Sequence, residues 1–116
     1  MRLVSIPKFF DCYILKDIII FIHMEIILKE ANGKGFAMAR EDDKRAGMMT
    51  YSIAGEELII IDHTDVDPAF NGKGVGKQLL YKIVEMAREK NIKIIPLCPF
   101  AASMFKKLED IRDVLK

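Results

Sequence analysis

Three glycines stand at alternate positions in the stretch NGKGVGKQLL, residues 71–80, with lysines between and after them. The glycines are Gly72, Gly74 and Gly76, and the lysines are Lys73 and Lys77. The residues that follow read as an amphipathic helix. A helix N-terminus has unpaired N–H groups and a partial positive charge, and glycine lets the backbone approach an anion closely. The pattern therefore favours a phosphate-binding turn over a turn needed only for tight packing.

Two familiar phosphate motifs do not fit this turn. A P-loop requires glycine at position 71 and serine or threonine at position 78, where the chain has Asn71 and Gln78. The dinucleotide fingerprint requires a further glycine at the position of Lys77 and a parallel βαβ start, which the preceding strands do not provide. The sequence thus predicts phosphate binding of another kind.

Cys98 is one of two side chains that could be reactive. It ends the apolar stretch IKIIPLC, and ligand clefts form at the carboxyl ends of strands in α/β folds. Its thiol could be a nucleophile, a proton donor, or a small buried apolar group.

His63 is the other reactive side chain, within the stretch ELIIIDHTDV. Strand alternation puts it on the face of Ile59 and Ile61, so we expect it to be at least partly buried. It could then act as a base near neutral pH, or simply bond to a neighbour or water.

The elements that position these groups follow from the periodicity of apolar residues. Four strands joined by turn residues predict an antiparallel meander, and the helix after the glycines ends at Asn91. The next strand is reached through that helix and should lie parallel to the strand before it. The fold class is therefore α/β (α+β), with a mixed sheet and a C-terminal helix. The expected strands are 25–30, 36–40, 46–55, 57–66 and 92–98, with one or two short helices in 99–116.

Composition limits the range of functions. The chain has 116 residues, enough for one small domain, and 18 basic residues nearly balance 17 acidic ones. The basic residues between Lys73 and Lys93 are not interleaved with aromatic residues, which argues against nucleic-acid binding. Cys12 and Cys98 show no paired metal-ligand spacing, so we expect no metal site, and free thiols indicate a cytoplasmic protein.

The first 23 residues are apolar but interrupted by charges: Lys8, Asp11, Lys16 and Asp17. The longest clean apolar run, Ile18 to Ile22, is far shorter than the roughly 20 residues that span a bilayer. We therefore expect neither a signal peptide nor a membrane partner. Residues 1–23 are either an added element packed on the domain or a dispensable extension before a domain at 24–116. We expect Cys12 and His23 to be incidental.

The stretch VDPAFNGKGVG, Val66 to Gly76, resembles the acetyl-CoA signature of the GCN5-related N-acetyltransferases. That signature has an apolar residue, a proline two positions on, Arg or Gln, two residues, Gly, one residue and Gly. The wider pattern HT-V…GKG-G…PLCPF is similar to a small single-domain branch of the superfamily. The resemblance covers residues 24–107, with the motif, helix, parallel strand and terminal helix in the same order.

This resemblance implies an acetyl-CoA-dependent N-acetyltransferase with a mixed, splayed sheet. Acetyl-CoA would lie between strands 57–66 and 92–98, and an unidentified amine would attack it directly in a ternary complex. No metal takes part in this scheme. Cys98 and His63 remain the candidate catalytic residues because of their own positions, and the resemblance assigns these residues to acetyl-CoA binding: Thr64, Val66, Asn71, Gly72, Lys73, Gly74, Val75, Gly76 and Lys77.

Three positions depart from the family pattern. Asn71 stands in place of Arg or Gln, Cys98 in place of Asn, and Phe105 in place of the tyrosine that often protonates the leaving thiolate. The loss of that tyrosine leaves an alternative open, in which the chain is a non-catalytic acyl-CoA-binding module.

Overall fold

The computed structural model of the chain describes residues 24–116. The predictions made for residues 1–23, including those for Cys12 and His23, lie outside the described residues. The elements follow in this order: β1 (Met24–Ala31), β2 (Lys34–Glu41), β3 (Lys44–Gly55), β4 (Leu58–Val66), η1 (Pro68–Phe70), α2 (Val75–Lys90), β5 (Lys93–Pro96), α3 (Pro99–Lys107) and η2 (Glu109–Val114).

Short turns build the meander of β1 to β4. Asn32 and Gly33 join β1 to β2 with φ of 56° and 80°, and Asp42 and Asp43 join β2 to β3 with φ of 53° and 67°. Two successive residues with positive φ suit the twist of a tight hairpin, and Asn, Asp and Gly tolerate that conformation best.

The five strands form one sheet in the order β1-β2-β3-β4-β5. The first four are antiparallel and β5 is parallel to β4, so the predicted fold class is confirmed. The predicted strand spans 92–98, whereas β5 is shorter and ends at Pro96. After that residue the chain turns away from β4 into α3.

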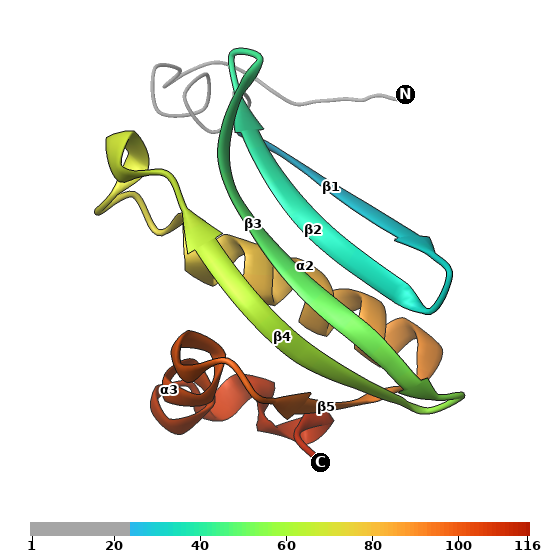
Figure 1. The fold of residues 1–116 in the computed structure, drawn as a ribbon. Helices are drawn as coiled ribbons and strands as arrows, with labels where there is room; N and C mark the ends of the chain where they lie inside the picture. The colour runs from blue at the N-terminus through green and yellow to red at the C-terminus, as the bar shows by residue number, and fades with distance from the viewer. Residues whose placement is uncertain (1–23) are drawn as a thin grey trace, which may run out of the picture.

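Figure 1 shows α2 lying across one face of the sheet, with α3 and the C-terminal segment beside β5. The core is formed by the apolar stripe of α2 and the sheet residues that face it. The core side chains that are less than 2% exposed include Met49, Tyr51, Ile59, Ile61, Leu79, Leu80, Ile83 and Ile94. No helix among the described residues has both the length and the apolarity to cross a membrane.

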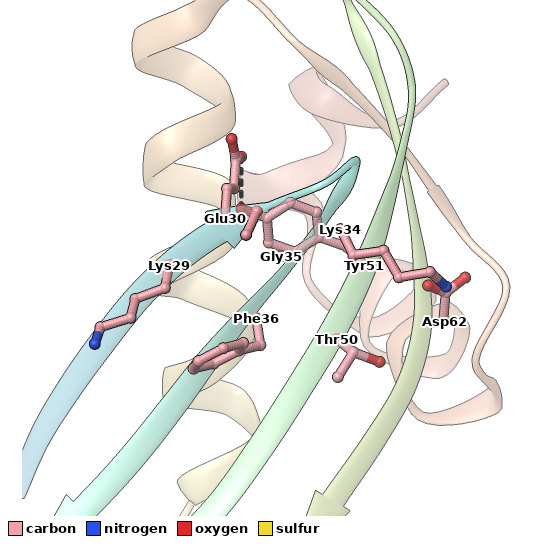
Figure 2. Close-up of a pocket in the computed structure, with 9 residues that line it drawn as sticks. Lys29, Glu30, Lys34, Gly35, Phe36, Thr50, Tyr51 and Asp62 are labelled. Carbon is pink, nitrogen blue, oxygen red and sulfur yellow. Dashed lines mark hydrogen bonds between the residues drawn. The ribbon is translucent and has the colours of Figure 1, made fainter.

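The opposite face of β1 to β4, which we call the open face, is not covered by any helix of residues 24–116 (Figure 1). A cavity of about 520 Å³ lies at its β1–β2 hairpin end, and Figure 2 shows the residues that line it. Tyr51 bounds this cavity with its ring over Gly35 and donates its hydroxyl to Glu30 Oε2 at 2.7 Å. Burial, together with the bond to Glu30, raises the pKa of Tyr51.

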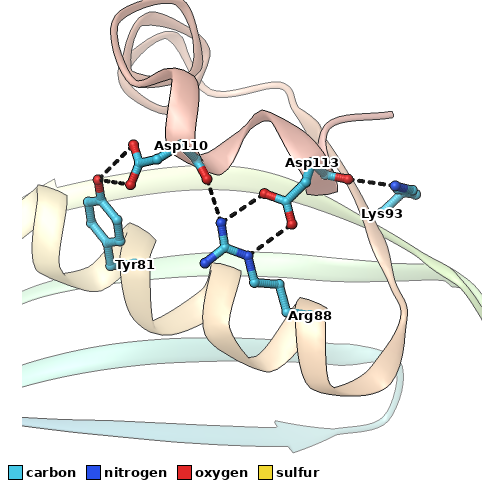
Figure 3. A network of polar contacts seen from close by, with 5 residues as sticks. All are labelled: Tyr81, Arg88, Lys93, Asp110 and Asp113. Carbon is cyan, nitrogen blue, oxygen red and sulfur yellow. Dashed lines mark hydrogen bonds and ion pairs between the residues drawn. The ribbon is translucent and has the colours of Figure 1, made fainter.

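A polar network fastens the C-terminal segment to α2 (Figure 3). Tyr81 donates to Asp110 at 2.9 Å, and Arg88 donates to both carboxylate oxygens of Asp113 at 2.8 and 2.9 Å. Lys93 donates to the backbone carbonyl of Asp113 at 2.6 Å. The hydrogen bond from Arg88 lowers the pKa of Asp113. The network holds η2 against the helix that follows the glycine turn.

Candidate active site

A β-bulge in β4 decides which of its side chains face α2. Tyr51 on β3 pairs with Ile61, but the preceding residue, Thr50, pairs with His63, so Asp62 has no partner across the ladder. The extra residue changes the phase of side-chain alternation along β4.

His63 lies on the open face as a result. It pairs with Thr50, whereas Ile61 pairs with the fully buried Tyr51, and the His63 side chain is exposed. The prediction that His63 is at least partly buried on the face of Ile61 is therefore wrong, because simple alternation does not continue through the bulge. Asp62 accepts a hydrogen bond from Ser52 Oγ at 2.6 Å, an acidic group that the sequence pattern did not single out.

β4 and β5 separate where their pairing ends. Ile61 and Pro96 are the last paired residues, and the N–H groups of Leu97 and Cys98 both donate to the Ile61 carbonyl, at 3.1 and 3.2 Å. β4 continues to Val66 without a β5 partner. The strands thus form the predicted V, and along one edge residues 62–66 have no strand partner among residues 24–116.

Thr64 and Cys98 meet across this V. After the bulge, Thr64 pairs with the buried Met49 and so faces the α2 side. Its Oγ1 lies 3.1 Å from Cys98 Sγ, close enough for a hydrogen bond in either direction. Cys98 is 5% exposed and occupies the N-cap position of α3, just before Pro99, without a capping hydrogen bond from its side chain.

The chemistry open to Cys98 depends on its neighbours. Within residues 24–116, the Thr64 hydroxyl is the polar side chain that contacts the thiol, and no cation or imidazole does. A nucleophilic thiolate is normally stabilised by such a partner, which the described surroundings of Cys98 do not supply. That thiol can donate a proton or form part of a wall.

The glycine turn begins with a capped single turn of helix. Asp67 Oδ1 accepts a hydrogen bond from the N–H of Ala69 at 3.0 Å and fixes the start of η1. Gly72 and Gly74 then have φ of 81° and 72°, and a Cβ placed on either would meet nothing within 4 Å. The backbone at both glycines therefore faces open space, as close approach to a ligand requires.

The start of α2 leaves several N–H groups free. Gly74 is the N-cap, no side chain caps it, and the helical ladder begins with Gln78 N–H donating to the Gly74 carbonyl at 3.0 Å. The N–H groups of Val75, Gly76 and Lys77 therefore have no acceptor within the helix. Together with the helix dipole, they form a site suited to an anion.

The third glycine has a different function from the other two. A Cβ on Gly76 would lie 2.6 Å from the ring of Phe100, so this position is glycine because α3 packs against it. Val75 is buried, and its side chain packs beside Gly47 of β3. Val75 and Gly76 can contact a ligand only through their backbone.

Asn71, Lys73 and Lys77 surround the turn and are all exposed. Lys73 Nζ lies 3.9 Å from a Glu41 carboxylate oxygen and 5.2 Å from the centre of the Phe70 ring. Lys77 extends along α2 toward Tyr81, with Nζ 5.9 Å from the ring centre. Both lysines can add electrostatic attraction for an anion at the turn, although Glu41 offsets part of the charge of Lys73.

Residues 35–114 match the family described as GCN5-related N-acetyl-transferase. A GCN5-like protein of Staphylococcus aureus is 37% identical and has a TM-score of 0.59, over 78% of this chain and 87% of that one. The uncharacterized protein YxbD of Bacillus subtilis is 36% identical over 63 residues, which are 54% of this chain and 38% of that relative. The chain therefore spans well under half of this curated relative.

A more distant structure shares the fold alone. It is a GNAT family acetyltransferase of Elizabethkingia anophelis with acetyl-CoA bound, 16% identical, with a TM-score of 0.56 over 64% of each chain. The family match extends over more than half of the sequence, from β2 to η2, and includes the glycine turn and the V. The chain belongs to the GCN5-related N-acetyltransferase family.

Proposed function

We propose that this chain transfers an acetyl group from acetyl-CoA to an amine by direct attack in a ternary complex. The observation that carries the proposal is the continuity of β4, the glycine turn and α2. An unpaired strand edge leads directly into a turn whose backbone faces open space and then into a helix with free N–H groups.

These features match the parts of acetyl-CoA in order. The free N–H groups from Val75 to Lys77 suit a pyrophosphate, and Lys73 and Lys77 add attraction for it. The unpaired edge near Thr64 and Val66 suits the amide groups of pantetheine, which can pair with a strand as another strand would. The family member from Elizabethkingia anophelis with acetyl-CoA bound supports this ligand.

The reaction requires two proton movements. The amine nitrogen forms a bond to the thioester carbonyl carbon while the carbon–sulfur bond breaks. The nitrogen loses a proton, and the CoA thiolate gains one. Binding both reactants in one cleft removes much of the entropic barrier.

We assign these two proton movements to opposite faces of β4. Cys98, in contact with Thr64, would donate a proton to the leaving thiolate. His63 on the open face would accept the proton of the amine through its imidazole. In this scheme the bulge separates acid from base.

The alternative is a non-catalytic acyl-CoA-binding module. It is favoured by Phe105, which is 3% exposed in the core and offers no hydroxyl at the position where many family members have tyrosine.

A turnover assay separates the two functions. The full chain is incubated with acetyl-CoA and a panel of amines, and both released CoA thiol and acetylated amine are measured. We expect both products in equal amounts. Binding of acetyl-CoA in a thermal-shift assay without either product would establish the binding module instead.

A further inference from the structure

The cavity on the open face is not needed to bind acetyl-CoA. It lies toward the β1–β2 hairpin, away from the glycine turn, and its walls come from all four antiparallel strands. Figure 2 shows Lys29, Phe36, Thr50 and Asp62 on successive strands across it. At about 520 Å³ the cavity is within the range of small-molecule sites.

The strand register explains this arrangement. Lys29 pairs with Phe36, and Phe36 pairs with Thr50, so the three form one row on the open face. On β4 the partner of Thr50 is His63, and Asp62, the extra residue of the bulge, directly precedes it. Asp62 follows Ile61, whose side chain is buried on the α2 side, so alternation places Asp62 on the open face, where it lines the cavity.

The cavity carries opposite charges at its two sides. Asp62 is oriented by the hydroxyl of Ser52, which leaves its other lone pairs available. Lys29 lies three strands away, roughly 14 Å between backbones at normal strand spacing. Lys29 makes no ion pair with another described residue. Lys34 pairs with Ser52 across the strands and therefore lies on the Asp62 side of the cavity. Phe36 supplies a flat apolar wall between these charges.

We propose that this cavity binds the acceptor as a zwitterionic amino carboxylate with a large apolar side chain. Asp62 receives the ammonium group, Lys29 receives the carboxylate, and Phe36 packs against the side chain. This inference rests on the proposed function, since it makes the ligand the acetyl acceptor. Asp62 directly follows Ile61, where β5 leaves β4, so the amine is held beside the V.

Indole compounds test the charge pattern directly. The chain contains no tryptophan, so indole fluorescence comes from the ligand alone. Three probes carry the same ring: L-tryptophan has both charges, tryptamine has only the amine, and 3-indolepropionate has only the carboxylate. In fluorescence anisotropy without acetyl-CoA, we expect L-tryptophan to bind about tenfold or more tightly than either of the others.

Paired variants assign each charge to its side of the cavity. Asp62→Asn should weaken L-tryptophan and tryptamine about tenfold and leave 3-indolepropionate unchanged. Lys29→Gln should weaken L-tryptophan and 3-indolepropionate and leave tryptamine unchanged. Lys90→Gln, which removes an exposed lysine at the end of α2, is the matched control. Equal binding of all three probes, or no response to the variants, would overturn the inference.

Transfer is measured separately as N-acetyltryptophan by mass spectrometry. If L-tryptophan binds as expected but no amine in the panel is acetylated, the proposed function fails and the acceptor assignment fails with it, while the charge-selective site stands. If other amines are acetylated and L-tryptophan does not bind, the cavity inference alone fails.

Discussion

Thr64 and Cys98 are 34 positions apart in the sequence and 3.1 Å apart in space. Their contact spans the V between β4 and β5, and it gives a buried thiol a hydroxyl partner rather than a base. Gly72 and Gly74 expose the backbone, whereas Gly76 accommodates Phe100. At the scale of single residues, the proposed site thus combines side-chain chemistry at Cys98 with backbone chemistry at the glycine turn.

Cys98→Ala should lower turnover while leaving acetyl-CoA affinity nearly unchanged, because the glycine turn provides most of the proposed binding. Initial rates and a thermal-shift titration measure the two effects. Intact-mass spectrometry with acetyl-CoA alone tests the direct-transfer mechanism. A stoichiometric acetyl adduct that is lost in Cys98→Ala would show a covalent mechanism, and full activity of the variant would make Cys98 a packing residue.

Gly74→Val should abolish most of the stabilisation by acetyl-CoA. For the parent chain, that stabilisation is about 2.7 kcal/mol at a hundredfold excess over the dissociation constant. A branched side chain would strain a residue with φ of 72° and fill the open space in front of its backbone. The difference in Tm with and without acetyl-CoA is the measurement. Gly55→Ala, at the exposed end of β3 and without positive φ, is the control, and an unchanged shift in Gly74→Val would exclude the phosphate turn.

At the scale of elements, two contacts between distant segments hold the site in position. The polar network of Figure 3 joins η2 to α2, and the Tyr51–Glu30 bond joins β3 to β1. The first stabilises the helix whose N-terminus follows the glycine turn. The second stabilises the hairpin end of the sheet, where the cavity lies.

Arg88→Met should lower the Tm at neutral pH. The hydrogen bond from Arg88 lowers the folded-state pKa of Asp113. The Arg88–Asp113 pair therefore contributes to stability above the ordinary carboxyl pKa of about 3.9, and this contribution is lost as the pH falls through the lowered pKa. The Tm difference between parent and variant should therefore shrink in acid. Melts from pH 7 to pH 2 measure it, with Lys82→Met as the control for an exposed pair within one helix. A difference that does not depend on pH would contradict this account.

Tyr51→Phe should lower the free energy of unfolding by about 1.5 kcal/mol at pH 7, the usual range for a hydrogen bond to a charged group. The folded-state pKa of Tyr51 is raised. The contribution of its hydroxyl to the free energy of unfolding is therefore complete below about pH 10 and is lost as the pH rises through the raised pKa. Urea unfolding at pH 7 and in alkali measures both effects. Tyr81→Phe, which removes an exposed hydroxyl–carboxylate bond, should cost less; equal losses would argue against a special contribution of Tyr51.

At the scale of the whole molecule, the described elements form one continuous core. The sheet, α2 and the C-terminal segment bury a single apolar cluster from β2 to η2, and residues of β1 pack against it. Every residue to which we assign a function lies in this unit. We therefore propose that residues 24–116 fold without the segment that precedes them.

A chain that begins at Met24 should melt cooperatively and show the same acetyl-CoA shift as the full chain. Circular dichroism and thermal-shift titrations of both proteins provide the comparison. Insolubility or a broad melt of the shortened chain would show that residues 1–23 belong to the fold.

Local chemistry in the sequence was sufficient to predict most of the architecture. The strand alternation, the helical period after the glycines and the turn residues Asn32 and Gly33 depend on neighbours within a few positions. A helix that runs back along the sheet returns the chain to the end where the preceding strand began, so the next strand is parallel to it, which also requires no partner information. The family signature likewise lies within one continuous stretch, Val66 to Gly76.

Tertiary structure alone decided where the chemistry is assembled. The bulge at Asp62 is a feature of the pairing between β3 and β4, and it moves His63 to the open face. The end of β5 is set by two N–H groups that share the Ile61 carbonyl, which brings Cys98 to Thr64. These outcomes depend on which strand edge and which carbonyl the rest of the fold presents. Periodicity along one segment contains no information about those partners, so the elements were predictable and their contacts were not.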